Sequence, residues 1–369
     1  MKLSLTKDEI RRYSRHLILK NIGIEGQLKL KKSKVFVVGV GGLGCSVLTY
    51  LTAAGVGNIG IADYDIVEES NLQRQILYDV TDIGKCKVEV AVQKLSKQNP
   101  YVKFDIYNTK ITKENILDII KNYDVIVDGS DNFSTRYLIN DSCIILNKIF
   151  VYGAIFQFEG QVSVFSYKNG PTYRCVYPEP PKPSDMPNCS EIGVFGAIPG
   201  LVGTIQANET IKIITGTGDV LSGKLFTINA LSFEVNIFNI NKIEENLNIK
   251  ELGDYDYTCE EDNTIKEISV VELKKMMDNN EDLQIIDIRE PNELIISTLG
   301  GELIPMEEIF NDIGKISKIK PVIFICRNGH RSRFVIKLLQ ENYNYKNLFN
   351  LRGGLNDWAD LIDKSMTKY

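Results

Sequence analysis

The chain has 369 residues, a formal net charge of -5, 43% hydrophobic and 25% charged residues. Because a domain has roughly 100–200 residues, this length allows more than one. The mild negative charge argues against direct binding of nucleic acid. We expect no membrane association and a cytoplasmic location, since no apolar run approaches the ~20 residues that span a bilayer, the N-terminal segment is too charged for a signal peptide, and the seven cysteines lack the dense spacing of a secreted scaffold.

The first element that we predict is a surface helix over residues 3–20. It has mixed charge and apolar residues at Ile10, Leu17 and Ile18. Arg15 lies on this segment, and by itself such an arginine is ordinarily a solvated cation on a helix face.

Residues 34–63 carry the first functional signal. An apolar run, Val35 to Val38, enters a glycine-rich turn, a small-residue helical pattern follows, and a second apolar run ends at Asp63. The glycines are Gly39, Gly41, Gly42 and Gly44. In such a turn, glycines permit the tight bend, the approach of a phosphate to the backbone, and close packing of helix on strand. The helix N-terminus favours an anion, and Asp63 suits a ribose hydroxyl. The segment predicts a nucleotide site in a doubly wound, mostly parallel α/β sheet.

Polar residues follow the second strand, in a loop where doubly wound sheets bind ligands. The loop includes Asp65, Ser70, Asn71, Gln73 and Arg74. Arg74 offers a planar fork of donors to a phosphate. Lys87 lies near the start of the next predicted helix, where the helix dipole disfavours a cation, so a bound phosphate would explain it. The alternative is a solvated lysine.

Further strands are predicted at residues 102–107 and 123–127, and the second is followed by Asp128, Asp131 and Asn132. A carboxylate beside a triphosphate is repulsive unless a cation intervenes, and Mg²⁺ is held by one or two carboxylates together with phosphate oxygens. We therefore consider Asp131 a metal ligand. The alternative is that Asp131 caps a helix over residues 133–147.

The motifs RYSRH, GVGGLG, DYD, SNLQRQ, GKCKVE and DGSDN, in this order and spacing, resemble the MoeB/ThiF (HesA) family. These are ubiquitin-activating-type adenylyltransferases, and the resemblance covers residues 1–240. It implies ATP and Mg²⁺ as ligands, a homodimer in which Arg15 reaches a phosphate across the interface, and catalytic roles for Arg15, Arg74 and Asp131. The implied nucleotide-binding residues are Gly39, Gly41, Gly42, Gly44, Asp63, Ser70, Asn71, Leu72, Gln73, Arg74, Lys87, Asp131 and Asn132.

The resemblance continues through predicted strands in residues 152–165 and a proline-rich crossover that contains Cys189, before a predicted helix at residues 196–216. In the family, a cysteine at this position lies on a loop that crosses the active site and forms a thioester or acyl disulfide with the carrier. The alternative is a half-buried cysteine without chemistry.

One departure from the family concerns zinc. Relatives often carry two CxxC pairs, whose four thiolates close a tetrahedral zinc site. Here the pairs read Thr172-Tyr173-Arg174-Cys175 and Asp256-Tyr257-Thr258-Cys259, so each keeps only its second cysteine. We predict no structural zinc and a clamp made by protein groups alone.

Residues 241–266 are acidic, polar and poor in large apolar side chains, which predicts a linker. Residues 267–369 resemble a rhodanese domain in the segments IIDIREPNE, IISTLGGELIPMEEI, PVIFICRNGHRS and NLFNLRGGLNDW. The predicted strand Val322 to Ile325 runs into a loop that begins at Cys326, and a helix is expected to begin near Ser332.

The loop after this strand predicts a reactive sulfur at Cys326. Backbone N–H groups and a positive helix end surround such a position, and Arg327 and Arg331 add positive charge. These features favour a thiolate, as a nucleophile or persulfide carrier requires. Four residues separate Cys326 from Arg331, whereas related phosphatases have C-x5-R, and the smaller ring suits a sulfane sulfur. A buried structural cysteine is the alternative, and we expect His330 on the loop surface.

The two resemblances together imply ATP-dependent adenylation of the C-terminal glycine of a ubiquitin-like sulfur carrier (MoaD/ThiS type), which ends in Gly-Gly. Sulfur then passes from a Cys326 persulfide to give a carrier thiocarboxylate, with Cys189 cleaving the acyl disulfide or holding the carrier. Such chemistry serves molybdopterin, thiamine or tRNA-thiolation pathways and needs an upstream sulfur donor such as a cysteine desulfurase. The alternatives are a non-catalytic carrier-docking protein and an NAD-linked oxidoreductase.

Overall fold

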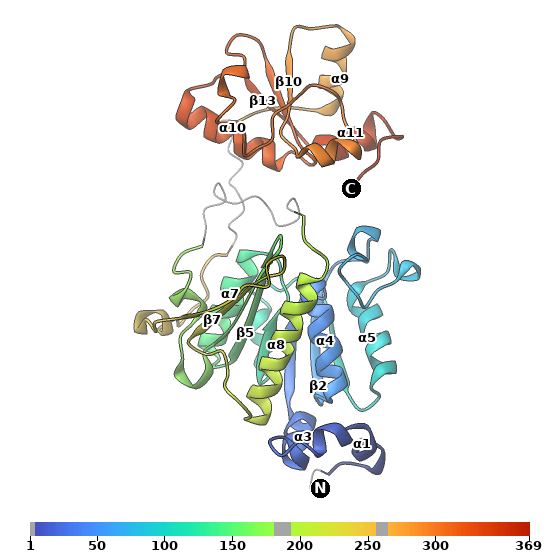
Figure 1. The fold of residues 1–369 in the computed structure, drawn as a ribbon, viewed down its shortest axis with the longest axis vertical. Helices are drawn as coiled ribbons and strands as arrows, with labels where there is room; N and C mark the ends of the chain where they lie inside the picture. The colour runs from blue at the N-terminus through green and yellow to red at the C-terminus, as the bar shows by residue number, and fades with distance from the viewer. Residues whose placement is uncertain (1–3, 181–192, 256–264) are drawn as a thin grey trace. The chain divides into compact units, whose positions relative to one another are not determined.

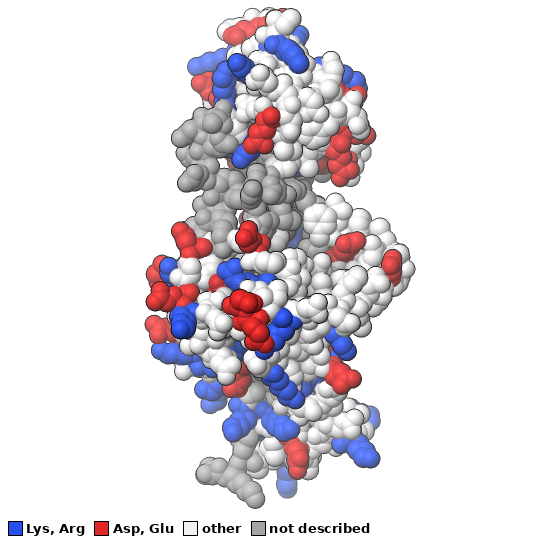
Figure 2. Space-filling view, turned by 90° about the vertical axis from the view of Figure 1, so that its left-hand side faces the viewer, with Lys and Arg blue, Asp and Glu red and all other residues white. Residues whose placement is uncertain are grey.

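The computed structural model describes residues 4–180, 193–255 and 265–369, which form two compact units (Figure 1). The larger unit contains residues 4–180 and 193–255, and the smaller contains residues 265–369. Within these described ranges, no helix is both long enough and apolar enough to cross a membrane. On the face of the larger unit drawn in Figure 2, acidic and basic side chains are intermixed.

The larger unit is built on an eight-stranded sheet with the order β3-β2-β1-β4-β5-β6-β7-β8. Its first five strands in that order run parallel, and β6, β7 and β8 are added antiparallel. The order places β1 between β2 and β4, at the point where the chain reverses its direction across the sheet, and confirms the doubly wound arrangement. The strands are β1 Lys34–Val38, β2 Asn58–Asp63, β3 Lys103–Asn108, β4 Val125–Asp128, β5 Ile149–Phe156, β6 Glu159–Phe165, β7 Lys224–Asn229 and β8 Val235–Asn239.

Helices cover both faces of this sheet, because alternate residues of the buried strands point to opposite sides. Val35 and Val37 of β1 pack with residues of α4 (Gly42–Ala54), α5 (Lys87–Gln98) and α8 (Ile198–Thr215). Phe36 and Val38 pack on the other face, with residues of α6 (Ile116–Ile120) and α7 (Phe133–Ile145). The helices α4, α5 and α8 lie side by side in Figure 1.

The N-terminal segment differs from the single surface helix that we predicted. It forms α1 (Lys7–Arg12), α2 (Ser14–Leu17) and α3 (Gly23–Lys32), and Tyr13 separates the first two. The apolar residues used for that prediction are largely exposed, with Ile18 at 72%. Tyr13 is buried instead, and its hydroxyl accepts a hydrogen bond of 2.9 Å from Asn99 Nδ2. The helix therefore breaks where a tyrosine must turn inward, which an apolar periodicity does not reveal.

Part of the segment interpreted as a linker belongs to the larger unit. Asp141, a buried residue of α7, pairs with Arg174 through both carboxylate oxygens, at 2.9 and 2.8 Å. Tyr255 donates its hydroxyl to the same carboxylate at 2.8 Å. Asn246 donates to the carbonyl of Arg174 at 3.0 Å. Residues up to 255 are thus held by polar contacts, which a composition poor in apolar residues does not predict.

The smaller unit is a five-stranded parallel sheet with the order β11-β10-β12-β13-β9. Its strands are β9 Lys266–Ile268, β10 Gln284–Asp287, β11 Glu302–Leu303, β12 Val322–Ile325 and β13 Leu348–Leu351, and its helices are α9 Val270–Asp278, α10 His330–Tyr343 and α11 Gly354–Leu361. The central strand β12 is buried along its length, and it ends directly before Cys326.

Candidate functional site

The glycine turn lies between β1 and α4. Glycine is required at its positions for different structural reasons. Gly39 has φ +87°, and a Cβ there would lie 2.8 Å from the carbonyl oxygen of Gly129. A Cβ on Gly44 would lie 2.0 Å from the carbonyl oxygen of Gly39, so helix and turn touch there. A Cβ on Gly41 would meet only Gln75 Nε2, at 3.9 Å. The backbone before α4 is therefore open at Gly41, where an anion can approach the helix N-terminus.

Asp63 and Asp65 close the neighbouring end of β2. Asp63 Oδ2 accepts the N–H of Val40 at 2.7 Å, and its Oδ1 accepts the N–H of Asp65 at 2.9 Å. The ammonium group of Lys87, which is 6% exposed, pairs with Asp65 at 2.9 Å. Lys87 is the first residue of α5, as expected, but its charge is balanced by a carboxylate where we predicted a phosphate. The ion pair with Asp65 therefore fixes the position of the Lys87 ammonium group near the glycine turn.

The SNLQRQ loop carries a residue that the sequence analysis missed. Gln75 is 4% exposed, and its Oε1 is a buried acceptor without a hydrogen-bond partner among the described residues. Its Nε2 lies at the open side of Gly41. Arg74 lies along the same turn, because a Cβ on Gly42 would be 3.6 Å from Arg74 Cγ. A buried amide oxygen that has no hydrogen-bond partner and lies beside an open backbone turn is a candidate for contact with a ligand. The only sequence signal for Gln75 is its place in the motif.

The other predicted residues of this loop have mixed surroundings. Asn71 is buried, and its Oδ1 accepts the N–H of Glu68 at 3.2 Å. Leu72 packs against the core, whereas Ser70 and Gln73 are exposed. Arg74 donates to the carbonyl oxygen of Ser70 at 3.0 Å. Contacts within the chain therefore account for Asn71 and Leu72.

The residues after β4 contradict the alternative that Asp131 caps the following helix. Asn132 is the N-cap of α7, and its Oδ1 accepts the N–H of Thr135 at 2.9 Å. Asp131 does not cap this helix, and it lies exposed beyond the carboxyl end of β4. Asp128 is fully buried, and its Oδ1 accepts the N–H and hydroxyl of Ser130 at 2.8 and 2.6 Å. The accessible carboxylate at this edge is thus Asp131.

Asp128 makes stability depend on pH. Burial raises the pKa of Asp128 to about 6, against the opposing effects of Arg136, 3.7 Å away, and Ser130. An acid whose pKa is higher in the folded chain binds more protons there, so stability falls as pH rises from about 4 to about 6. Asp128→Asn cannot titrate, so we expect it to lack this fall of about 3 kcal/mol in the free energy of unfolding.

Urea unfolding at several pH values measures this difference. Asp124→Asn is the matched control, since Asp124 is an exposed carboxylate just before β4. It should keep the pH dependence of the natural chain. An Asp128→Asn chain with the same pH dependence as the natural one would contradict this account.

Arg15 is far from the glycine turn of its own chain. Tyr13 packs against Gly55, the residue that ends α4, because a Cβ on Gly55 would lie 2.5 Å from the tyrosine hydroxyl. The glycine turn is at the opposite end of α4, whose 13 residues span about 20 Å. Arg15 is exposed on α2 at the Tyr13 end. A single chain therefore does not bring Arg15 to the other predicted nucleotide-binding residues.

Two predicted sites involve residues outside the described ranges. Cys189 and Cys259 both lie there. Cys175 is described: its Sγ accepts the N–H groups of Thr172 and Ile243, each at 3.4 Å. Burial raises the pKa of this thiol, but the hydrogen bonds from Thr172, Ile243 and Asn246 outweigh burial and lower it. Within residues 4–180, 193–255 and 265–369, no three His, Cys, Asp or Glu side chains form a group that could hold a metal ion.

Cys326 is the centre of the site in the smaller unit. It follows β12 directly and is completely buried. Its Sγ accepts the N–H of Gly329 at 3.1 Å and lies 3.2 Å from Ser332 Oγ. Gly329 has φ +92°, so the loop curls around the sulfur in a conformation that favours glycine. Helix α10 begins at His330, whose side chain is exposed, two residues before Ser332, near which we predicted its start. The geometry suits a sulfur that accepts backbone hydrogen bonds.

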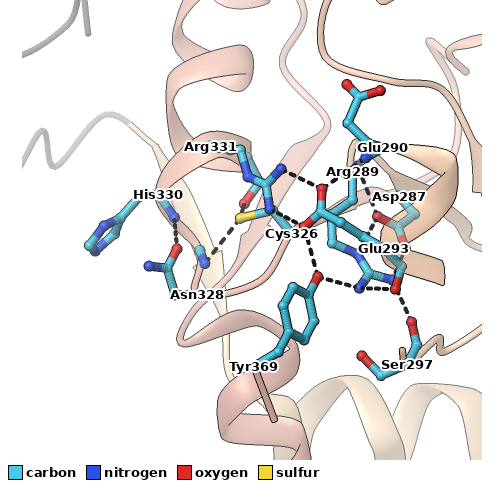
Figure 3. A network of polar contacts seen from close by, with 12 residues as sticks. Asp287, Arg289, Glu290, Glu293, Ser297, Cys326, Asn328, His330, Arg331 and Tyr369 are labelled. Carbon is cyan, nitrogen blue, oxygen red and sulfur yellow. Dashed lines mark hydrogen bonds and ion pairs between the residues drawn. The ribbon is translucent and has the colours of Figure 1, made fainter. Parts of the chain in front are cut away.

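The guanidinium of Arg331 forms an ion pair with a carboxylate. Arg331 donates to both carboxylate oxygens of Glu293, at 2.8 and 2.7 Å (Figure 3). Burial raises the pKa of Glu293, but the hydrogen bonds from Arg331, Glu290 and Tyr369 bring it to about 2. Arg331 therefore faces Cys326 as half of an ion pair, whereas we expected it to add a full positive charge.

Tyr369 completes this network from a distant part of the sequence. Its hydroxyl donates to Glu293 Oε1 at 2.7 Å and accepts from Arg289 at 2.8 Å (Figure 3). Arg289 is buried and pairs with Asp287. The guanidinium of Arg327 lies over the tyrosine ring, 5.1 Å from its centroid. One tyrosine thus joins the two buried ion pairs and contacts the cysteine loop.

We expect Tyr369→Phe to lower the free energy of unfolding of the smaller unit by about 1–3 kcal/mol. It removes the hydroxyl between two buried charged groups and keeps the ring under Arg327. Denaturant unfolding followed by the fluorescence of Trp358, the one tryptophan of the sequence, measures the change. Tyr343→Phe is the control, since Tyr343 stacks on Phe310 at the surface and should change stability little. Equal stability of Tyr369→Phe and the natural chain would refute the role of the hydroxyl.

Family models match most of the chain. A model of the ThiF family matches residues 13–249, and a model of the rhodanese-like domain matches residues 269–361. Tyr369 lies outside the second match. Gly39 to Asn132 lie inside the first match, and Cys326 lies inside the second.

Similar proteins cover nearly the whole chain. The probable adenylyltransferase/sulfurtransferase MoeZ of Mycobacterium tuberculosis is 38% identical, over 99% of this chain and 97% of its own length. The adenylyltransferase and sulfurtransferase MOCS3 of Drosophila yakuba is 39% identical, over 99% and 86%. The crystal structure of Escherichia coli MccB with ATP aligns with 64% of this chain and 73% of its own, with a TM-score of 0.56 and 22% identity, which is a likeness of fold. The chain therefore belongs to the ThiF family, as an enzyme of the adenylyltransferase/sulfurtransferase type with a C-terminal rhodanese-like domain.

Proposed function

We propose that this enzyme uses ATP to adenylate the C-terminal glycine of a ubiquitin-like sulfur carrier and then converts that glycine to a thiocarboxylate. The observation that carries the proposal is the loop of Cys326, which holds a buried sulfur under the N–H of Gly329, in one chain with an open glycine turn at Gly41. The first site suits activation of a carboxylate, and the second suits delivery of sulfur to it. Neither site alone would account for the presence of both in one chain.

The activation step uses the carboxyl edge of the larger sheet. The terminal carboxylate of the carrier attacks the α-phosphorus of ATP, the bond to pyrophosphate breaks, and a carrier acyl-adenylate forms. Arg74 and Lys87 lie beside the glycine turn, where their charges stabilise the phosphates. Asp131 is the exposed carboxylate that would hold Mg²⁺ together with phosphate oxygens, and the metal would neutralise developing charge. Asn132 stays the cap of α7, next to it.

The activation site is completed by a second copy of the chain in this proposal. Arg15 lies about a helix length from its own glycine turn, so an Arg15 that reaches a phosphate must come from a partner subunit. A homodimer with two shared sites satisfies this requirement.

The sulfur step begins when Cys326 takes a sulfane sulfur from a donor such as a cysteine desulfurase and becomes a persulfide. The outer sulfur attacks the carbonyl of the acyl-adenylate, AMP leaves, and an acyl disulfide joins Cys326 to the carrier. A thiol, for which Cys189 is the candidate, then attacks Cys326 Sγ. The thiocarboxylate leaves with the bonding pair, and a disulfide remains for an external thiol to reduce.

The sequence predicted residues 1–240 for adenylation, 241–266 for the linker and 267–369 for sulfur transfer. The contacts of Asn246 and Tyr255 extend the adenylation unit of this proposal to residue 255. The described free cysteines favour a reducing compartment such as the cytoplasm. The product would serve molybdopterin, thiamine or tRNA thiolation. The similarity to adenylyltransferase/sulfurtransferase enzymes argues against the two alternatives from the sequence, a carrier-docking protein without catalysis and an NAD-linked oxidoreductase.

The proposal is tested by incubating the full chain with ATP, Mg²⁺, thiosulfate and a carrier that ends in Gly-Gly. We expect carrier-dependent ATP–pyrophosphate exchange and a carrier mass in which sulfur replaces one oxygen. A carrier without its last glycine is the control and should give neither. Exchange without a thiocarboxylate would support the adenylation step and refute the sulfur-transfer step, and no exchange would refute adenylation of this carrier.

Zinc content is a separate prediction. Thr172 stands where a ligand would be needed, and Cys175 is surrounded by hydrogen-bond donors. We expect metal analysis of the purified chain to find well under one zinc per chain, and chelator treatment to leave the unfolding curve unchanged. One tightly bound zinc per chain would overturn this prediction.

A further inference from the structure

Two separate segments of the chain hold Arg327, the residue that follows Cys326 in the loop between β12 and α10. The carbonyl oxygens of Cys326 and Arg327 accept the N–H groups of Leu355 and Asn356, at 3.0 and 2.9 Å. Both donors belong to the first turn of α11. This close approach requires Gly354, because a Cβ there would lie 2.5 Å from the carbonyl oxygen of Cys326. The start of α11 therefore fixes the backbone of the cysteine loop through its carbonyl groups.

The side chain of Arg327 is held by a second segment, which follows α11. The guanidinium carbon of Arg327 lies 5.1 Å from the centroid of the Tyr369 ring. A cation over the face of an aromatic ring is attracted by the electron density of that face, and the ring has no net charge that would neutralise the cation. The contact therefore fixes the direction of the guanidinium without cancelling its positive charge.

The Tyr369 ring is fixed in turn by the hydroxyl at its far end. This hydroxyl donates to Glu293 and accepts from Arg289, which is fully buried (Figure 3). Burial raises the pKa of Tyr369 to about 12, so at neutral pH the hydroxyl keeps the proton that it donates to Glu293. Charge-assisted hydrogen bonds on both sides of one hydroxyl leave the ring little freedom to turn. Arg327 therefore lies over a ring whose position is set by its neighbours.

The two arginines beside Cys326 differ in what an incoming molecule can reach. Arg331 is 7% exposed and donates to both carboxylate oxygens of Glu293. Arg327 is partly exposed. A negatively charged sulfur donor that approaches Cys326 can therefore contact Arg327 more readily than Arg331.

We propose that Tyr369 is a positioning residue, which directs the guanidinium of Arg327 toward the anionic group of an incoming sulfur donor. With thiosulfate as the donor, the thiolate of Cys326 attacks the sulfane sulfur and a new S–S bond forms. The S–S bond of thiosulfate breaks, sulfite leaves with the bonding pair and two negative charges, and Cys326 becomes a persulfide anion. Because the guanidinium attracts a dianion more strongly than a monoanion, its orientation favours donors of higher charge.

The test compares two sulfur donors that differ by one negative charge, thiosulfate and methanethiosulfonate, with cyanide as the acceptor. The measured quantity is the ratio of the two kcat/KM values in the full chain. Tyr369→Leu removes the ring, so we expect kcat/KM for thiosulfate to fall by about tenfold, and the ratio of thiosulfate to methanethiosulfonate by about threefold. A general loosening of the fold would lower both values by the same factor and leave the ratio unchanged.

Tyr369→Phe separates the ring from the hydroxyl. It keeps the ring under Arg327, so its ratio should equal that of the natural chain, although we expect its stability to fall. Tyr343→Leu is the matched control for the loss of a tyrosine ring, since Tyr343 stacks on Phe310 at the surface, and it should leave the ratio unchanged. Arg327→Met should lower the ratio as Tyr369→Leu does. With Arg327→Met present, Tyr369→Leu should lower it no further.

An unchanged ratio in Tyr369→Leu, or a further fall in the double variant, would overturn the proposal. If Tyr369→Leu does not fold, as judged by Trp358 fluorescence, Tyr369→Gln replaces it, because a glutamine amide can donate and accept hydrogen bonds but has no ring. Arg327→Met changes only a partly exposed side chain, and an unchanged ratio in this variant would also overturn the proposal.

This inference rests on the proposed role of Cys326, and the two fail in different ways. If the natural chain transfers sulfur from neither donor, or if Cys326→Ser transfers it fully, the role of Cys326 is refuted and the positioning role with it. If sulfur is transferred through Cys326 with a ratio that does not depend on Tyr369, only the positioning role is refuted.

Discussion

Cys326→Ser is expected to abolish transfer of sulfur from thiosulfate to cyanide, by at least about a thousandfold in kcat/KM. A hydroxyl oxygen cannot carry a sulfane sulfur, so the covalent intermediate is lost and not merely slowed. Serine is close to cysteine in size and can still accept the N–H of Gly329, so the loop should keep its fold. ATP–pyrophosphate exchange with the carrier should persist, because that reaction belongs to the larger unit. The two assays on one variant therefore separate the two chemistries.

Cys86→Ser is the control for this experiment. Cys86 is a half-buried thiol directly before α5 in the larger unit. It should leave thiosulfate sulfurtransferase activity at the level of the natural chain. Full activity in Cys326→Ser would place the sulfur on another cysteine and would remove the basis of the proposed mechanism.

Mixing two inactive variants, Arg15→Ala and Asp131→Ala, is expected to restore adenylation. Each variant alone should lose ATP–pyrophosphate exchange by about 10²-fold or more, because each removes a charge that contacts the phosphates or their metal. In a mixed dimer, one of the two sites combines an intact Arg15 from one subunit with an intact Asp131 from the other. Random exchange of subunits makes half of the dimers mixed, so about a quarter of the natural activity should return.

The controls for this mixture are the separate variants at the same total concentration, and Arg11→Ala mixed with Asp131→Ala. Arg11 is an exposed arginine of α1 that pairs with Asp8. Arg11→Ala should be fully active alone, so its mixture with Asp131→Ala shows dilution only. If Arg15→Ala and Asp131→Ala do not complement each other after subunit exchange, both residues act in one chain or Arg15 is not in the site. The first outcome would conflict with the length of α4 between Arg15 and the glycine turn.

The pairing of Arg331 with Glu293 bears on how the sulfur site works. A guanidinium paired with a carboxylate stabilises a nearby negative charge less than a free one does. The N–H of Gly329 also donates to the sulfur, so hydrogen bonds from the loop act on Cys326 beside the paired arginine.

Local patterns in the sequence were sufficient for much of this description. The apolar run from Val35 to Val38, the spacing of Gly39 to Gly44 and the strand end at Asp63 predicted the β1–α4–β2 unit and the doubly wound sheet, which the structure confirms. The run from Val322 into Cys326 likewise predicted a cysteine at a strand end before a helix. These features are decided by residues a few positions apart, so their signals survive in the sequence alone.

Tertiary structure decided which polar groups meet. Tyr13 breaks the predicted N-terminal helix because Asn99 and Gly55, distant in sequence, accommodate its ring. Tyr369 approaches the cysteine loop from a segment without any motif. Directional hydrogen bonds depend on side-chain orientation in the packed chain, and neither hydrophobic periodicity nor spacing encodes that orientation. The sequence by itself therefore determined the fold class and the positions of Gly41 and Cys326, while only the folded chain determined that Arg331 is paired and that Asn132 is the cap.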